Sequence, residues 1–365
     1  DSTNPPSKSE LQSLLGLLEQ SFGEGAAGVS IGLQYSHEIN VTDVELVALA
    51  ELAARHDKLL AVSLRNESEQ VVESARELAA LAEQTGARIK ISHLKIRHRA
   101  YWPLLTQLLD TLETAWHRGA KIYFDCYPYT ETWQPLYTYL PTWATEGGRQ
   151  QLLGRLQNDS ERKRILSALQ NHPTNLSEIT VASSGPGMKV NGRKMSELAK
   201  TMGLTSEETI LNLIEHGGSA TLVFDNCLDQ GTVNLLCNHA LSFLGTNGGG
   251  FSLQHSDRLV HPRCFGSSAK FLRQVLDTKA ISLEEAIAKM TSRPAKALNL
   301  NKKGVIATGY DADLVIFDPT KINSQASITN PYQYSQGMTA VLVGGQMAVQ
   351  NSQPTGLLSG KFIAS

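Results

Sequence analysis

Short apolar segments alternate with helical segments through the first third of this sequence at a nearly constant spacing. The segments Gly28–Leu33, Leu59–Ser63, Ile89–His93 and Lys121–Asp125 begin about 30 residues apart, and a helical pattern follows each of the first three. Strands that alternate with helices form a parallel sheet covered by those helices. A period of this length is typical of the (β/α)8 TIM-barrel, so the sequence predicts an α/β fold of that type.

Helix starts are marked by a hydroxyl side chain three residues before a glutamate. This capping-box spacing occurs at Ser7–Glu10, Thr42–Glu45 and Ser282–Glu285. The hydroxyl and the carboxylate then satisfy backbone N–H groups of the first turn, which predicts a helix at each position. Further helices are expected over roughly 69–85 and 104–118.

The pattern of apolar and polar residues changes twice along the chain. Residues from about 131 to 238 are less regular, and they predict an inserted helical region before a final barrel strand at Ala240–Gly245. From residue 303, the short β-type runs Val305–Ile306, Leu314–Phe317 and Ala340–Val343 predict part of a small β-sandwich. We therefore expect a barrel portion over 1–302 and a C-terminal β-domain portion over 303–365.

Composition excludes several classes of protein. Lys and Arg number 33 against 35 Asp and Glu, so there is no electrostatic reason to expect a nucleic acid or an anionic membrane as partner. No apolar run is long enough to predict a membrane-spanning helix.

The four cysteines form no CxxC pair, which favours a reducing compartment and a cytoplasmic location. The start at Asp1 leaves open a fragment end, a processing site or an engineered start.

Polar residues follow the predicted strands where barrel enzymes place their reactive groups. These strand ends read 63–67 (SLRNE), 92–95 (SHLK), 125–129 (DCYPY) and 245–249 (GTNGG). Because the carboxyl ends of barrel strands meet on one face, we expect these segments to form one site.

The same segments resemble the D-aminoacylase branch of the amidohydrolases, the N-acyl-D-amino-acid deacylases. The resemblance rests on the order and spacing of 28–35 (GVSIGLQY), 64–67 (LRNE), 91–95 (ISHLK), 125–129 (DCYPY), 261–263 (HPR), 282–286 (SLEEA), 290–294 (MTSRP), 309–318 (GYDADLVIFD) and 341–346 (VLVGGQ). One such peptide is a weak signal, but the ordered set spans almost the whole chain. It implies that the chain carries barrel strands 4–8 and that the first strands are missing from it.

The resemblance also implies a zinc site that is degenerate here. In the family, zinc is held by an HxH on the first strand, a Cys on an early strand and His residues that end the fifth and sixth strands, and an Asp after the eighth strand is the general base. His93 matches the sixth-strand ligand, whereas Ser63 stands at the position of the fifth-strand His and Asn247 at that of the Asp base. A neutral hydroxyl is a poor zinc ligand and an amide has no carboxylate to accept a proton. We therefore expect that this chain alone does not assemble the family's zinc site.

Other residues at the strand ends are candidates with two interpretations each. Tyr127 and Lys95 are candidates for catalysis, and Arg65, Glu67, Tyr129 and Arg263 for substrate binding. The alternative for Arg65 and Glu67 is a buried ion pair that braces the strand end, and for Lys95 a solvated or paired lysine. For the two tyrosines it is a rigid turn packed with aromatic rings, and for Arg263 a role in bracing the loop. Cys126 either replaces a missing ligand or is a small buried hydrophobe. Eight other histidines form no HxH pair and are expected to be structural or on the surface: His37, His56, His98, His117, His172, His216, His239 and His255.

Three functions follow from the resemblance and its departures. The first is an N-acyl-D-amino-acid deacylase, which hydrolyses an amide C–N bond of a small N-acyl amino acid, with the missing strands supplied by an N-terminal segment or a complementary chain. The second is a catalytically inactive binding subunit. The third is a pocket used for metal-free chemistry such as acyl transfer or cyclisation. Five strands cannot close an eight-stranded barrel without exposed edges, so a partner or a homo-oligomer is also expected.

Overall fold

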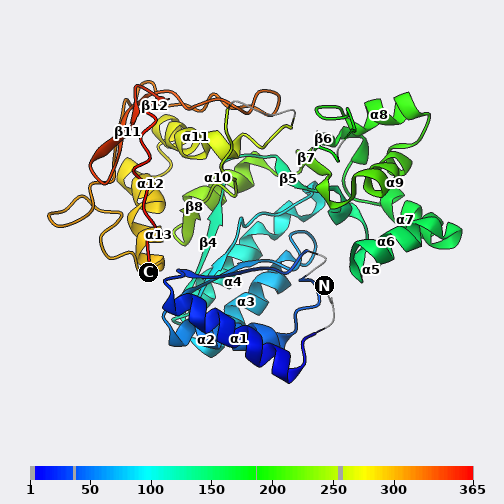
Figure 1. Cartoon of the computed structure of the whole chain (residues 1–365), viewed down its shortest axis with the longest axis horizontal. Helices are drawn as coiled ribbons and strands as arrows, with labels where there is room; N and C mark the ends of the chain where they lie inside the picture. The colour runs from blue at the N-terminus through cyan, green and yellow to red at the C-terminus, as the bar shows by residue number, and fades with distance from the viewer. Residues whose placement is uncertain (1–4, 36–37, 186, 254–257, 365) are drawn as a thin grey trace.

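A parallel sheet of five strands forms the centre of the molecule (Figure 1). The computed structural model describes residues 5–35, 38–185, 187–253 and 258–364. The strands run in the order β1-β2-β3-β4-β8, with β1 Gly28–Gly32, β2 Leu59–Ser63, β3 Arg88–Ile91, β4 Ile122–Cys126 and β8 Ser242–Leu244. Every neighbouring pair is parallel, which confirms the fold class predicted from the alternation of strands and helices.

Helices that connect the strands cover one face of this sheet (Figure 1). They are α2 Asp43–Arg55, α3 Val71–Thr85 and α4 Leu105–His117, the last preceded by the 3-10 turn η1 Arg99–Leu104. The helix α1 Lys8–Gly23 precedes β1 and packs on α2. The capping boxes predicted at Ser7 and Thr42 are both formed. At Ser282 the hydroxyl accepts the N–H of Glu285, so the third predicted helix start is also confirmed.

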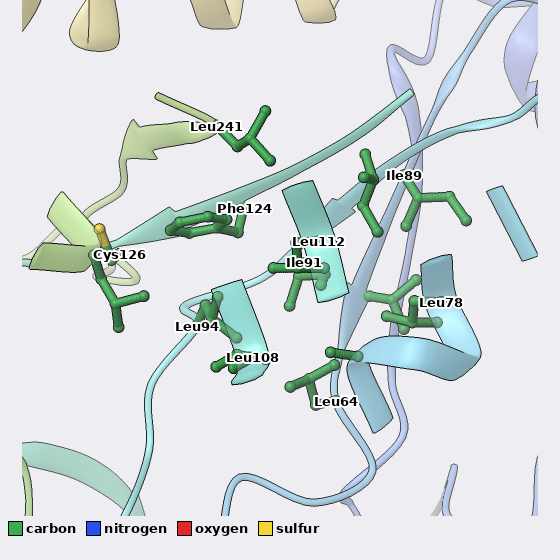
Figure 2. Close-up of a cluster of buried hydrophobic side chains, with 14 of the residues drawn as sticks. Leu64, Leu78, Ile89, Ile91, Leu94, Leu108, Leu112, Phe124, Cys126 and Leu241 are labelled. Atoms are coloured by element: carbon green, nitrogen blue, oxygen red, sulfur yellow. The ribbon is translucent and has the colours of Figure 1, made fainter. Parts of the chain in front are cut away.

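The hydrophobic core lies between the sheet and α3 and α4 (Figure 2). On β3, Ile89 and Ile91 are fully buried toward the helices, while Arg88 and Lys90 alternate to the other face. Complete burial of each such side chain stabilises the fold by about 1.5–3 kcal/mol. The opposite face carries polar groups, including an ion pair between Lys90 and Asp125. The strand alternation therefore keeps apolar side chains under the helices and turns polar ones to the inner face of the sheet.

Within the described residues the sheet is open. β1 pairs only with β2 and β8 only with β4, so each leaves one edge without a strand partner among the described residues. Tyr123 and Phe243 stack on each other on β4 and β8 with ring centroids 5.4 Å apart. A hollow of about 750 Å³ lies beside these two rings, at the N-terminal ends of the strands.

The segment between β4 and β8 folds into a lobe with its own core (Figure 1, green). It contains β5 Thr132–Pro135, η2 Leu136–Tyr139, α5 Thr142–Thr145, α6 Gly148–Gln157, α7 Asp159–Gln170, η3 Leu176–Glu178, β6 Thr180–Ser183, α8 Met195–Met202, α9 Ser206–Gly217, η4 Gly218–Ala220 and β7 Leu222–Asp225. The helix α10 Gln230–Asn238 follows the lobe and packs on the main core beside β4 and β8. The three strands of the lobe form an antiparallel sheet in the order β5-β7-β6. Sequence periodicity predicted the helices here but not this sheet.

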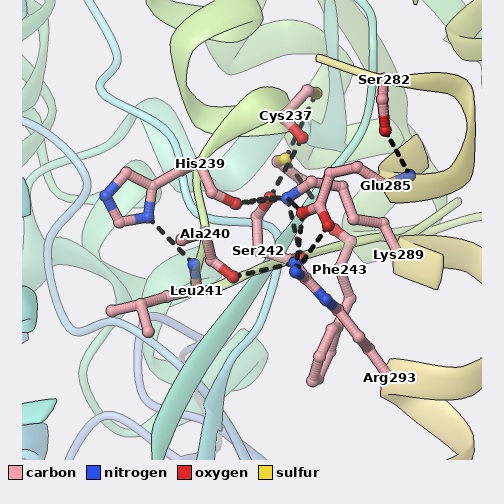
Figure 3. Close-up of polar contacts among 11 residues, drawn as sticks. Cys237, His239, Ala240, Leu241, Ser242, Phe243, Ser282, Glu285, Lys289 and Arg293 are labelled. Atoms are coloured by element: carbon pink, nitrogen blue, oxygen red, sulfur yellow. Dashed lines mark hydrogen bonds and ion pairs between the residues drawn. The ribbon is translucent and has the colours of Figure 1, made fainter.

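Three helices follow β8: α11 Arg263–Thr278, α12 Leu283–Met290 and α13 Ser292–Ala297. Lys289 of α12 is fully buried, and its amine donates to Ser242 Oγ at 2.8 Å and to the carbonyl oxygen of His239 (Figure 3). This contact holds α12 against the start of β8.

The chain ends in an antiparallel sheet of order β12-β11-β10-β9. Its strands are β9 Leu314–Phe317, β10 Met338–Val343, β11 Gln346–Gln350 and β12 Gln353–Pro354. The prediction of a strand at Val305–Ile306 is wrong. These two residues are irregular, and they are 51% and 89% exposed. Two consecutive β-branched residues are too short a run to form a strand without a neighbouring strand to pair with. None of the described helices is both long and apolar enough to span a membrane.

Candidate active site

The predicted site residues that follow β2, β3 and β4 meet at one end of the parallel sheet. Ser63 is the last residue of β2, His93 lies two residues beyond β3, and Tyr127 directly follows β4. All three are nearly inaccessible to solvent. Parallel neighbours bring their carboxyl ends to the same edge, which is why residues far apart in sequence converge here.

His93 is the centre of a chain of polar contacts. Its Nε2 lies 3.0 Å from Ser63 Oγ, and its Nδ1 lies 2.8 Å from Lys95 Nζ and 3.2 Å from Glu67 Oε1. Lys95 Nζ also donates to Glu67 Oε1 at 2.5 Å and to the His93 carbonyl at 3.0 Å. Four of the residues predicted for the site are thus directly connected.

The backbone at His93 is held in a conformation that few residues adopt. Its φ is 43°, in the left-handed region that is uncommon for a residue with a Cβ. The N–H of His93 donates to Asp125 Oδ1 at 2.6 Å, and the next N–H, of Leu94, donates to the Asp125 carbonyl at 2.8 Å. Asp125 on β4 therefore fixes the turn that aims the imidazole at Ser63.

The charges in this cluster shift one another's protonation. Although burial opposes ionisation of Glu67, the Lys95 ammonium and the His93 ring lower the pKa of this carboxyl to about 2. Burial and the nearby positive charge of Lys95 lower the pKa of His93. Burial also lowers the pKa of Lys95, while Glu67 opposes that shift. The lowered pKa keeps the His93 imidazole neutral at neutral pH, and the 2.5 Å separation of Lys95 Nζ and Glu67 Oε1 is that of a buried ion pair.

A second group of predicted residues lies next to the first. The guanidinium of Arg263 stacks on the Tyr127 ring, with Cζ 4.7 Å from the ring centroid, and its Nε donates to the carbonyl of Asn247 at 2.9 Å. Asn247 is exposed and has a φ of 44°. Arg263 contributes to the lowered pKa of Lys95, so the two groups share one electrostatic environment.

Two candidates point elsewhere. Arg65 donates through Nε to Glu77 at 2.9 Å and through Nη2 to the carbonyl of Val41 at 2.8 Å. The contact with Glu77 is an ion pair that braces the end of the strand, as the second interpretation of Arg65 expects. The Tyr129 hydroxyl lies 3.4 Å from the Pro262 carbonyl, and the Lys270 amine lies over its ring.

Arg97 belongs to the site and was not singled out from the sequence. Its side chain is buried, its Nε and Nη2 have no hydrogen-bond partner among the described residues, and its Cζ lies 5.3 Å from the Tyr139 ring centroid. The Tyr127 hydroxyl and Glu67 Oε2 also lack partners there. The signal in the sequence is the spacing of Lys95 and Arg97, since residues two apart in an extended segment point to the same side.

The residues present do not fit the zinc that the family resemblance implies. Where a second ligand would stand, the Ser63 hydroxyl is hydrogen-bonded to His93, and the Lys95 ammonium lies 2.8 Å from the other ring nitrogen. Among the described residues, no three His, Cys, Asp or Glu side chains are grouped to hold a metal ion. Cys126 is buried and its sulfur lies 3.2 Å from that of Cys237, so its environment is that of a core residue. His37 and His255 lie outside the described residues.

Part of the chain matches a known protein family, and nearly all of it is similar to two curated deacylases. The family model described as "Amidohydrolase family" matches residues 191–348. An N-acyl-D-aspartate deacylase of Alcaligenes xylosoxydans xylosoxydans is 28% identical over 98% of this chain and 63% of its own length. An N-acyl-D-glutamate deacylase of the same organism is 26% identical over 97% of this chain and 64% of its own length. The chain thus spans less than two thirds of these curated relatives.

Solved structures show the same fold. The N-acyl-D-glutamate deacylase of Bordetella bronchiseptica, solved with zinc and a phosphonate inhibitor, superimposes with a TM-score of 0.83 at 24% identity and covers all of this chain and 68% of the other. A D-aminoacylase superimposes with a TM-score of 0.80 at 22% identity over 99% of this chain and 67% of its own. Together these matches show that residues 191–348 fit the amidohydrolase family model and that the chain is similar, over nearly its whole length, to N-acyl-D-amino-acid deacylases.

Proposed function

We propose that this chain carries the substrate-binding part of an N-acyl-D-amino-acid deacylase, an enzyme that hydrolyses an amide C–N bond. The observation that carries the proposal is the group of buried cations at the strand ends, Lys95, Arg97 and Arg263. Only Lys95 is paired with a carboxylate of the described residues, Glu67. Buried positive charge without a partner is costly, so the site favours an anionic ligand such as the carboxylate of an N-acyl amino acid.

The residues divide between the two ends of such a ligand. Arg263, stacked on Tyr127, and Arg97 supply N–H donors for the carboxylate, since a guanidinium matches a carboxylate with two parallel hydrogen bonds. Ser63 and His93 lie at the neighbouring strand ends, where the acyl amide would be placed.

We further propose that the sheet is completed by strands outside this sequence. The open edges of β1 and β8 expose unpaired backbone groups, and such edges pair with further strands or are covered in stable proteins. The N-terminal part of a longer chain or a complementary chain would supply them. Size measurement by light scattering tests this: the chain alone is expected to self-associate, and co-expression with an upstream segment is expected to give a 1:1 unit. A stable monomer of the chain alone would contradict it.

Calorimetric titration with N-acetyl-D-glutamate, N-acetyl-D-leucine and the carboxamide of the latter tests the binding proposal. We expect both acids to bind and the carboxamide to bind at least tenfold more weakly, because a carboxylate pairs with a guanidinium by charge-assisted hydrogen bonds. Arg263→Met should weaken binding of the acids, whereas Arg76→Met, on the surface of α3, should not. Release of free D-amino acid measures turnover.

The outcomes separate the candidate functions. Binding with turnover supports the deacylase. Binding without turnover, also in the presence of an upstream segment, supports the inactive binding subunit instead. If neither acid binds, the proposal is wrong.

A further inference from the structure

The polar chain at His93 has the geometry of a catalytic triad. Ser63 Oγ, His93 Nε2, His93 Nδ1 and Glu67 Oε1 follow in sequence, with gaps of 3.0 Å and 3.2 Å on the two sides of the ring. In a triad the ring accepts the serine proton at Nε2 while Nδ1–H donates to the carboxylate. The direction of these two hydrogen bonds decides whether Ser63 is a nucleophile.

Lys95 sets the opposite direction. An ammonium has three N–H donors and no acceptor. Lys95 Nζ has three acceptors within reach, namely Glu67 Oε1, the His93 carbonyl and His93 Nδ1. Nδ1 therefore accepts, and a neutral imidazole that accepts at Nδ1 carries its proton on Nε2. That N–H then donates to Ser63 Oγ.

Ser63 is left with a hydroxyl hydrogen to donate. The contact with His93 is its side chain's only hydrogen bond within the described part of the chain. Hydrogen bonds that run in one direction polarise one another, so a hydroxyl at the end of this chain is a better donor than an isolated one. Burial of the whole chain, with Ser63, His93, Lys95 and Glu67 each less than 9% exposed, keeps water from competing for it.

We infer that the order Lys95–His93–Ser63 is a one-way chain of hydrogen-bond donors in which the Ser63 hydroxyl binds the acyl oxygen of the ligand. This inference rests on the proposed function for the identity of the ligand, but the direction of the chain does not. Ser63 is thus a donor to a carbonyl or carboxylate oxygen and not a nucleophile.

The direction of the chain is measured without any ligand. Nitrogen-15 NMR distinguishes the two neutral tautomers of His93, whose signals are assigned by their loss in His93→Gln. We expect the proton on Nε2. A proton on Nδ1 would overturn the inference. Treatment with a fluorophosphonate provides a second readout: the expected result is no adduct on Ser63, and an adduct that Ser63→Ala abolishes would show a nucleophile instead.

The ligand contact is measured with N-acetyl-D-glutamate by calorimetry. Ser63→Ala should weaken binding about threefold to tenfold, the usual effect of one neutral hydrogen bond. Ser63→Thr, which keeps the hydroxyl, should restore it, and Ser92→Ala next to His93 is the matched control with no change. If the parent protein binds and Ser63→Ala binds equally well, this inference is wrong and the proposed function stands. If the parent does not bind, both the proposed function and the ligand contact are overturned, and the NMR result still decides the direction of the chain.

Discussion

His93 and Asp125 are joined across neighbouring strands, with the backbone N–H of His93 2.6 Å from Asp125 Oδ1. The same carboxylate pairs with Lys90 on the inner face of the sheet. One acidic residue of β4 thus holds both the turn after β3 and a half-buried cation. Within the described part of the chain, Asp125 positions the imidazole without a hydrogen bond of its own to Ser63.

Replacing Asp125 tests this support. Asp125→Ala leaves the His93 N–H and the Lys90 amine without their acceptor, so we expect the free energy of unfolding to fall by about 1–3 kcal/mol. Urea denaturation measures the change, and Asp110→Ala on the exposed side of α4 is the control. An unchanged midpoint would show that the carboxylate does not hold the turn.

Replacing Lys95 should reverse the chain of hydrogen bonds. In Lys95→Met nothing donates to His93 Nδ1, and Glu67 Oε1, 3.2 Å away, is the acceptor that remains. We expect the His93 proton to move to Nδ1 in the NMR spectrum. The variant should also lose about 3–5 kcal/mol of stability, because a buried carboxylate loses its partner. If the tautomer is the same in the parent and in Lys95→Met, Lys95 does not set it.

The buried amine of Lys289 should make the stability of the protein depend on pH. Burial lowers the pKa of this amine to about 8 from 10.5, with Arg293 adding to the shift and Glu285 opposing it. The thiols of Cys126 and Cys237 act on Lys289 in the same sense as Glu285. Between these two pKa values the unfolded chain binds a proton that the folded chain does not, so stability rises with pH in this range. We expect the parent to gain stability between pH 7.5 and 10 relative to Lys289→Met.

Urea denaturation at both pH values measures this difference. Lys296→Met, at an exposed lysine of α13, is the control that should follow the parent. At pH 7.5, Lys289→Met should already differ from the parent, because Ser242 Oγ and the His239 carbonyl lose their donor. An equal pH dependence in parent and Lys289→Met would contradict the lowered pKa.

Restoring a ligand at position 63 tests the zinc site. Ser63→His places a second imidazole beside His93, and two imidazoles bind zinc better than one. We expect the parent to retain less than one zinc per chain after gel filtration and Ser63→His to retain more, as measured by mass spectrometry of the metal. Asn247→Asp alone, which adds no imidazole, is the control. Stoichiometric zinc in the parent that is lost in His93→Gln would show that the centre holds metal as it stands.

The sequence by itself determined the five strands of the parallel sheet, the helices that connect the first four of them and their order along the chain. The period of the alternation predicted five parallel strands, and the helix starts at Ser7 and Thr42 are formed by the side chains that predict them. These features are local, because an N-cap bond or a run of apolar residues depends on neighbours within a few positions. Strand ends differ from the prediction by one or two residues, as expected of boundaries where pairing stops.

Tertiary structure decided what the polar residues do. Arg65 and Lys95 both follow a strand in a motif of the same kind, yet Arg65 pairs with Glu77 on α3, whereas Lys95 turns inward to Glu67 and His93. Arg97 belongs to no motif. It became a candidate only because its side chain is buried and two of its nitrogens have no hydrogen-bond partner among the described residues. In the antiparallel sheet β5-β7-β6, β5 likewise pairs with β7, about 90 residues further along the chain. Side-chain partners depend on which distant elements the fold brings within a few ångströms, and the linear pattern of the sequence does not contain that distance.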